Sequence, residues 1–293
     1  MRSQLCRLAI LLLVALPGLW GCGAATGFLP SAAAPAVSIA AVGATKAARA
    51  SREISDSEEY YVGRAVAARI LDTYPLYRNP ALTEYVNEVG QTVARKSPRP
   101  NTYKGYHFAV LDSEEINAFA CPGGTIFITR GLLATCASED ELAAVLAHEV
   151  THVVDKDGIN SISKARWTEV WTSMGAEAAR QYGGAAGNLV NLFEGSVDDV
   201  FKSLVVNGYS RNAEYAADAG SVKISIAAGY DPGALAKVLA KIQAKETPGA
   251  GGFYKTHPPA RERLARVKAE APRVAPSAAE VTRTQRFQKI VKV

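Results

Sequence analysis

The most constraining feature of this 293-residue sequence is a pair of histidines, His148 and His152, four positions apart with Glu149 between them. Only 4 histidines occur in the chain, so the pair is not a product of composition. Ser138, followed three residues later by a glutamate, precedes an apolar run. This is the pattern of a capping box, and it predicts a helix that reaches about Asp155. Residues four apart lie on one face of a helix, so both imidazoles can bind one metal ion.

Glu149 is the acid that completes this motif. It lies about 100° around the helix axis from His148, beside a bound metal rather than on it. There its carboxylate can accept a proton from water and deliver it to a leaving amine. The pattern His-Glu-x-x-His is typical of zinc-dependent peptidases. The alternative is two solvated histidines on an amphipathic helix, and four apolar flanking residues argue against it: Val145, Leu146, Val153 and Val154.

A catalytic zinc site needs a third protein ligand and an open fourth position. The extended motif with a downstream glycine and histidine is excluded, because Asp155 and Gly158 stand at those positions. Glu214 is the best candidate, since Asp218 lies four residues on and can accept the outer N–H of a ligand histidine. By spacing alone, a surface acidic pair is an equally good interpretation. Two other glutamates lack such a partner and are weaker candidates: Glu177 and Glu194.

Three blocks of this sequence resemble a known family. The histidine motif, the pair Glu214 and Asp218, and the segment Asn117 to Gly124 (Asn-Ala-Phe-Ala-Cys-Pro-Gly-Gly) resemble the HtpX- and CAAX-protease-type zinc metallopeptidases, peptidase family M48. The resemblance covers roughly residues 55 to 270, in the family's order, and suggests the soluble periplasmic lipoprotein branch. It implies one zinc ion per chain. The implied ligands are His148, His152 and Glu214, the implied base is Glu149, and Asp218 is implied to bond a ligand histidine.

The fold expected from these patterns is α+β: a mainly helical, zincin-like metallopeptidase domain with a small β-sheet whose edge strand lies beside the motif helix. Periodic apolar positions predict helices near residues 57–74, 80–95, 138–155, 212–228 and 231–245. Strands are expected at residues 106–111 and 125–129. His107 in the first strand, and Trp167 and Trp171, are interpreted as structural residues.

An edge strand beside a metal helix can pair with the backbone of an extended substrate. We predict such a substrate-binding strand at Gly124, Thr125, Ile126 and Phe127, after the turn that begins at Pro122. Pairing through backbone groups depends little on substrate sequence, which suits a peptidase that acts on unfolded chains. The alternative is an interior strand without contact to substrate.

Cys121 and Cys136 are the cysteines that follow residue 22. An even pair in an exported domain predicts a disulfide. A less favoured hypothesis makes Cys121 the third zinc ligand.

His257 follows a glycine-rich loop and precedes two prolines. It is predicted to stabilise an oxyanion, or to occupy the open position of the zinc and keep the enzyme latent. A plain surface histidine is the alternative. The family resemblance adds an arginine after the His-Pro element, here Arg261.

The first 21 residues read as a signal peptide with a lipobox. Arg2 and Arg7 precede a short apolar run, which falls below the roughly 20 residues that a membrane span requires. The run ends Leu-Trp-Gly-Cys, which resembles a bacterial lipobox and makes Cys22 the predicted lipidation site. Ordinary cleavage beside an incidental cysteine is the alternative. Gly23, rather than an aspartate, follows the cysteine and favours the outer membrane, facing the periplasm.

Composition sets the remaining boundaries. Residues 22–50 are rich in Ala, Gly, Pro and Ser and predict a lipid-anchored flexible tether. Residues 51–272 form the predicted zinc metallopeptidase domain. Residues 273–293 lack an apolar face and are expected to be a disordered tail. The net charge of +5 is too weak an excess to suggest nucleic acid as a partner.

The sequence therefore predicts a zinc-dependent endopeptidase of the bacterial cell envelope. Its expected substrates are misfolded or unassembled envelope proteins, and its expected contact with the membrane is the lipid anchor. Another hypothesis is an assembly factor or chaperone that uses a peptidase fold mainly for binding. A third is a zinc hydrolase that acts on a non-peptide amide.

Overall fold

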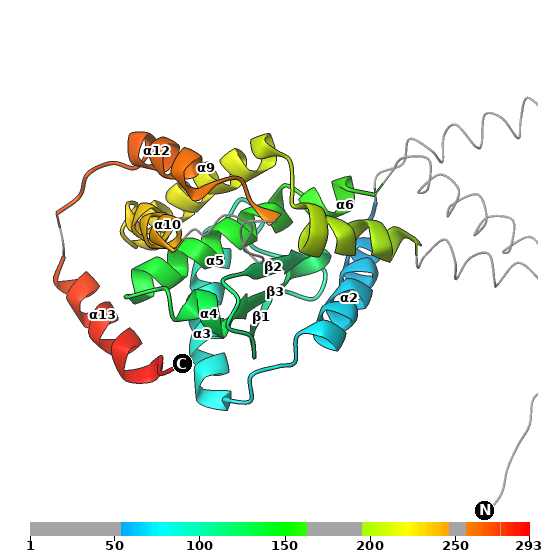
Figure 1. The fold of residues 1–293 in the computed structure, drawn as a ribbon, viewed down its shortest axis with the longest axis horizontal. Helices are drawn as coiled ribbons and strands as arrows, with labels where there is room; N and C mark the ends of the chain where they lie inside the picture. The colour runs from blue at the N-terminus through cyan, green and yellow to red at the C-terminus, as the bar shows by residue number, and fades with distance from the viewer. Residues whose placement is uncertain (1–53, 163–194, 246–255, 276) are drawn as a thin grey trace, which may run out of the picture. The chain divides into compact units, whose positions relative to one another are not determined.

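The computed structural model describes residues 54–162, 195–245, 256–275 and 277–293 (Figure 1). It is mainly helical with one 3-stranded sheet, which confirms the predicted α+β class. The described elements follow this order: α2 (Asp56–Thr73), α3 (Pro80–Ala94), β1 (His107–Leu111), β2 (Ala118–Cys121), η1 (Pro122–Gly124), β3 (Thr125–Thr129), α4 (Arg130–Leu133), α5 (Glu139–Val154), α6 (Asp157–Asn160), η2 (Ser203–Asn207), α9 (Arg211–Ala228), α10 (Ala234–Ala244), α12 (Ala260–Glu270) and α13 (Ala278–Ile290).

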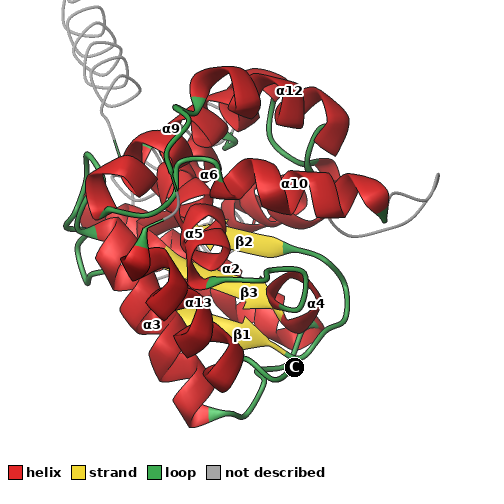
Figure 2. Cartoon of the chain, turned by 90° about the vertical axis from the view of Figure 1, so that its left-hand side faces the viewer, coloured by secondary structure: helices red, strands yellow, loops and turns green. Residues whose placement is uncertain are grey.

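The strand order of the sheet corrects one prediction. Strand β3 lies in the middle, parallel to β1 and antiparallel to β2 (Figure 2). Both sides of its backbone are therefore paired, and the proposed substrate strand at Thr125, Ile126 and Phe127 has no free edge; Gly124 belongs to η1. The edge strand that packs against α5 is β2. Its four residues are all buried, so no alternation of polar and apolar residues marks it in the sequence.

The two edges of the sheet differ in their free backbone groups. On β1, the Asn87 side chain bonds both the N–H and the carbonyl of Phe108, and the Tyr77 N–H donates to Val110. These contacts close that edge to further strands. On β2, the Asn117 carbonyl accepts from β3. By the alternation of an antiparallel ladder, Ala120 then directs its N–H and carbonyl outward.

The sheet separates two hydrophobic clusters. Ile126 packs with α3 and α5 on one face, and Phe127 packs with α2 on the other. Cys121 lies in the cluster of α2, whereas Cys136 lies in the cluster of α5. Both thiols are free and buried, so the predicted disulfide is wrong. The two cysteines lie on opposite sides of the sheet, and burial raises the pKa of each thiol.

Helix α5 carries the histidine motif through the centre of the fold (Figure 1). It packs against β2, α3, α9, α10 and α13, and every residue of it except Val154 is buried. Ser138 caps the helix as predicted, by accepting from the Glu141 N–H at 3.3 Å. The Glu141 carboxylate accepts instead from the Ala137 N–H, so the capping box is only half formed.

The C-terminal segment is a second correction, because residues 278–290 form helix α13 rather than a disordered tail. Arg283 binds the buried Asp140 of α5 through Nε and Nη2, at 2.8 and 2.7 Å, and Arg286 binds the buried Glu139. Phe287 is only 4% exposed. One aromatic anchor and the ion pairs of Arg283 and Arg286 with α5 hold this helix, which explains why the sequence shows no apolar stripe.

Several predictions concern residues that lie outside the described ranges. They are the leader, Cys22, the tether, the tryptophans Trp167 and Trp171, and the glutamates Glu177 and Glu194. Within the described ranges, every helix is too short or too polar to cross a lipid bilayer.

Candidate metal centre

Four potential metal donors meet beside α5. His148 and His152 come from α5 and Glu214 from the first turn of α9, while His257 lies three residues before the start of α12. One donor atom from each lies within 4.8 Å of the others. The two Nε2 atoms are 3.2 Å apart, and each lies 3.6 Å from a Glu214 carboxylate oxygen. Tetrahedral zinc with bonds of 2.0–2.1 Å places its ligand atoms about 3.3 Å apart, so the predicted ligands have a suitable spacing.

Glu214 provides an independent test of whether a cation fits. The residue is fully buried, and its Oε1 lacks a hydrogen-bond partner among the described residues. Burial alone would raise the pKa of Glu214, but the neighbouring His257, His148 and Arg263 hold it well below its usual value. A buried, ionised oxygen without a donor requires a positive partner. A zinc ion held by the two histidines and Glu214 would supply it.

A carboxylate orients each imidazole of the motif. His148 Nδ1 lies 3.1 Å from Asp218, the predicted partner, and His152 Nδ1 lies 2.8 Å from Asp157. Burial and the charge of Arg263 lower the pKa of His148, but hydrogen bonds to Asp218 and Glu214 outweigh them and raise it to about 9. In both cases Nδ1 faces an acid and Nε2 faces the donor cluster. Such pairs fix the ring orientation of metal-binding histidines.

Sequence reasoning missed Asp157. The residue begins the short helix α6, directly after Lys156, whose φ of 56° is left-handed. This turn reverses the chain at the end of α5 and returns Asp157 to the ring of His152. The only signal in the sequence is an acid five residues after the second histidine, which is too common to single out.

The arginine beside the site is Arg263, not Arg261. Arg261 is exposed, whereas Arg263 is 1% exposed and binds both oxygens of Asp218 at 2.9 and 2.6 Å. Its Nη2 also lies 3.3 Å from His148 Nδ1. Ala260, Arg263 and Val267 form the buried side of α12. Their spacing of three and four residues is the signal that could have found this arginine.

Glu149 and His257 differ in their contacts. Glu149 is 3% exposed, and its carboxylate has no hydrogen bond from any described residue, so it is available to accept a proton. His257 Nδ1 lies 2.6 Å from Glu214 Oε2, so Nδ1 carries the proton. Burial lowers the pKa of His257 and favours this neutral form.

Two other candidate residues lie outside the site. Cys121, the rival third ligand, is absent from the donor cluster, and His107 is exposed on β1.

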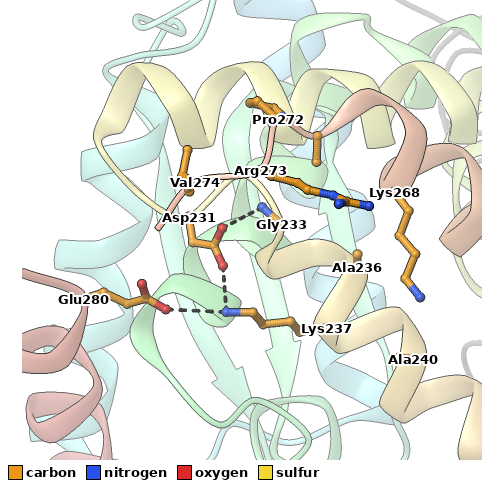
Figure 3. Close-up of a pocket in the computed structure, with 11 residues that line it drawn as sticks. Asp231, Gly233, Ala236, Lys237, Ala240, Lys268, Pro272, Arg273, Val274 and Glu280 are labelled. Carbon is orange, nitrogen blue, oxygen red and sulfur yellow. Dashed lines mark hydrogen bonds and ion pairs between the residues drawn. The ribbon is translucent and has the colours of Figure 1, made fainter. Parts of the chain in front are cut away.

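A cavity that could hold a small molecule lies away from these donors. It has a volume of about 820 Å³ and lies between α10 and the segment that follows α12 (Figure 3). Lys237 points into it but is paired with Asp231 at 2.7 Å and Glu280 at 3.4 Å. None of its lining residues belongs to the donor cluster.

Two histidines four apart on one helix, an acid between them and a glutamate from a second helix define the metal-binding site of a gluzincin-type metallopeptidase. Comparison with known families agrees with this class. The model of Peptidase family M48 matches residues 80–271, more than half of the chain. The chain belongs to peptidase family M48.

Individual relatives are similar at low identity. The chain is 26% identical to the beta-barrel assembly-enhancing protease of Escherichia coli (strain K12), over 76% of this chain and 46% of the relative. It is 30% identical to the mitochondrial metalloendopeptidase OMA1 of Schizosaccharomyces pombe, over 52% of this chain and 42% of the relative. The chain is 24% identical to a protease HtpX homolog of Janthinobacterium sp. (strain Marseille), over 70% of this chain and 76% of the relative. The chain thus spans about half the length of the first of these relatives.

Proposed function

We propose that this chain is a zinc-dependent endopeptidase that cuts unfolded protein chains. The observation that carries the proposal is the donor cluster, with spacings suited to zinc and with Glu149 beside it, free of hydrogen bonds from described residues. His148, His152 and Glu214 would hold the ion. Zinc in such a site acts as a Lewis acid that polarises a peptide carbonyl and makes water more acidic.

The protein's own groups handle the proton. Glu149 accepts it from the attacking water and returns it to the leaving nitrogen. Asp218 and Asp157 accept hydrogen bonds from the Nδ1 atoms of the two histidines, which keeps both Nε2 atoms directed at the ligand cluster. The charge of Arg263 keeps Asp218 ionised, and its hydrogen bonds fix the carboxylate.

His257 belongs to the resting form of the site. A catalytic zinc centre keeps one position open, and four protein donors would close it. His257 is the donor that can leave, because it lies outside the helices that carry the other three. With zinc bound, proteolysis would require the His257 side chain to move away from the donor cluster.

The edge strand β2, which pairs only with β3 among the described residues, is the proposed substrate-binding strand in place of β3. Ala120 offers an outward N–H and carbonyl beside α5, so an extended peptide can add as a further strand next to the metal ligands. The other edge is closed by Asn87 and Tyr77. Pairing through the backbone selects for unfolded chains rather than for one sequence.

We further propose that the protein works in the bacterial cell envelope. The predicted lipid anchor at Cys22 would hold it at the outer membrane, facing the periplasm. One relative is named for enhancing beta-barrel assembly, which makes misfolded or unassembled envelope proteins the proposed substrates.

Casein digestion by the purified full chain, with and without a chelator, tests the function. Glu149→Gln should retain zinc and lose digestion, because the amide cannot accept the proton. Glu88→Gln is the matched control, since Glu88 is exposed on α3 away from the donors. Digestion that persists in Glu149→Gln, or in metal-free protein, contradicts the proposal.

A second candidate is an assembly factor that binds clients and cuts little. The burial of the site favours it, because Glu149 and the donors are nearly inaccessible while His257 lies in the cluster. The same variant separates the two roles. If cells carrying Glu149→Gln assemble their envelope normally, binding rather than cutting is the function.

A further inference from the structure

A buried carboxylate lies on α2, outside the donor cluster. Glu59 is 0% exposed, and fully buried glutamates are rare unless they are paired. Its Oε1 accepts hydrogen bonds from the Gly123 N–H at 2.9 Å and from Arg99 Nη1 at 3.0 Å. Its Oε2 accepts from Arg99 Nη2, also at 3.0 Å. Donors from two different parts of the chain therefore fix both oxygens of Glu59.

Arg99 extends this contact to the motif helix. Its Nη1 also donates to the Val153 carbonyl, at 3.3 Å. Val153 directly follows the candidate ligand His152, and its carbonyl lies in the last turn of α5, where a positive charge is favourable. The Arg99 side chain is 15% exposed, so water screens these contacts only in part. The guanidinium of Arg99 thus joins α2 to the C-terminal end of α5.

Gly123 extends the contact to the edge strand. It lies in η1, the turn that directly follows β2. A Cβ atom at Gly63 of α2 would overlap the Pro122 carbonyl oxygen, so the backbones of α2 and this turn are in direct contact. The hydrogen bond from Gly123 to Glu59 therefore anchors the C-terminal end of β2 to α2.

The spacing between β2 and α5 decides where a peptide paired with β2 lies relative to the metal ligands. Under the proposed function, on which this inference rests, the peptide must place its scissile carbonyl at the metal. We propose that Glu59 is a positioning residue, which acts through Arg99 to hold β2 and α5 at the distance that catalysis requires. A misplacement of about 1 Å at a reacting group can lower the rate about 100-fold.

This role predicts a particular kinetic signature. The peptide pairs with the backbone of β2, which remains when the Glu59–Arg99 pair is lost, so peptide binding should survive. Only the alignment with the metal should be lost, and an interaction that aligns the reacting groups affects kcat rather than KM. Loss of folded protein would instead lower the amounts of bound zinc and bound peptide together with kcat.

The test uses the full chain and one peptide substrate. Combining Glu59→Gln with Arg99→Met removes both charges, so that no buried charge is left unpaired and the fold is preserved. The kcat of this double variant should fall at least about 10-fold while its KM stays within about threefold of the wild type. Zinc should remain at one ion per chain. The same peptide should bind with unchanged affinity when Glu149→Gln is added to prevent cleavage.

A third acid provides the matched control. Asp56 binds Arg99 at 2.8 Å, but it is exposed and lies outside the contacts that join β2 to α5. The kcat of Asp56→Asn should therefore stay within about twofold of the wild type. Glu59→Gln and Arg99→Met alone should each lower kcat. The double variant should be no slower than the slower single variant, because both residues act through one pair.

Each other outcome has a distinct meaning. A folded double variant with the kcat of the wild type overturns the inference, as does an equal fall in Asp56→Asn. Effects of the single variants that multiply in the double variant show independent action and also overturn it. Loss of zinc or of peptide binding in step with kcat shows that the pair only stabilises the fold; the positioning role is then wrong while the peptidase function stands. A wild type that cleaves neither the peptide nor casein refutes the proposed function, and this inference with it.

Discussion

The pair formed by His152 and Asp157 offers a quantitative test of how the site holds its metal. Asp157 Oδ2 lies 2.8 Å from His152 Nδ1, and the Asp157 side chain is 15% exposed. The carboxylate fixes the ring with Nε2 toward the donor cluster and makes that nitrogen a better ligand. We therefore expect Asp157→Asn and Asp157→Ala to weaken zinc binding without removing any ligand atom.

The magnitude follows from this one hydrogen bond. A hydrogen bond to a charged group contributes about 1.5–3 kcal/mol. If that stabilisation is lost from the metal-bound form, the zinc dissociation constant rises by roughly 10- to 150-fold. Asn retains an oxygen acceptor but not the charge, so Asp157→Asn should lie near the lower value. Asp157→Ala should approach the upper one.

Competition with a chromogenic zinc chelator measures both dissociation constants. Asp112→Asn is the control, because Asp112 also forms an ion pair, with Arg130 at 2.7 Å, and lies outside the donor cluster. Its zinc affinity should equal that of the wild type. If the dissociation constant of Asp157→Ala stays within about twofold of the wild type, the Asp157 carboxylate does not strengthen zinc binding by His152, and the inference from its hydrogen bond to Nδ1 is wrong.

Three further predictions address other parts of the structure. His257→Ala should keep its zinc and digest casein faster; loss of the metal would instead make His257 an essential ligand. Phe287→Ala should lower the free energy of unfolding by about 3 kcal/mol in urea titrations, whereas an unchanged value would mean that α13 is not packed. Burial opposes the low pKa of Asp218, but the charge of Arg263 holds it well below its usual value. Its contribution to stability is therefore present above the unfolded pKa of about 4 and lost as the pH falls below it. The melting temperature should therefore fall as the pH is lowered below about 4, and it should fall by less in Asp218→Asn. An equal fall in both proteins would mean that Asp218 does not contribute to this pH dependence.

Local patterns were sufficient to predict much of the fold and of the site. The caps at Asn79 and Ser138 mark the starts of α3 and α5, and both side chains accept the expected backbone N–H. The four-residue spacing of His148 and His152 places both rings on one helical face, and the structure brings Glu214 to them. These features depend on contacts within a few residues, or on a helical period that the sequence displays directly.

The residues that sequence reasoning misplaced all depend on long-range contacts. Nothing in the residues of β3 indicates that it has two neighbours, because strand order depends on which segments pair across the sheet. Arg263 was overlooked because a buried cation is tolerated only beside acids that come from another helix. Helix α13 depends on Glu139 and Asp140 of α5, which lie more than a hundred residues earlier in the chain.

The sequence by itself therefore determined the metal-binding motif, its helix, its acid and the mainly helical class of the fold. Only the tertiary structure decided that β2 is the edge strand beside α5, that the two cysteines lie apart, and that Arg263 completes the site. The physical reason is the range of the interactions. Helical periodicity and capping act over a few residues, whereas strand order and buried ion pairs join segments that meet only when the chain folds.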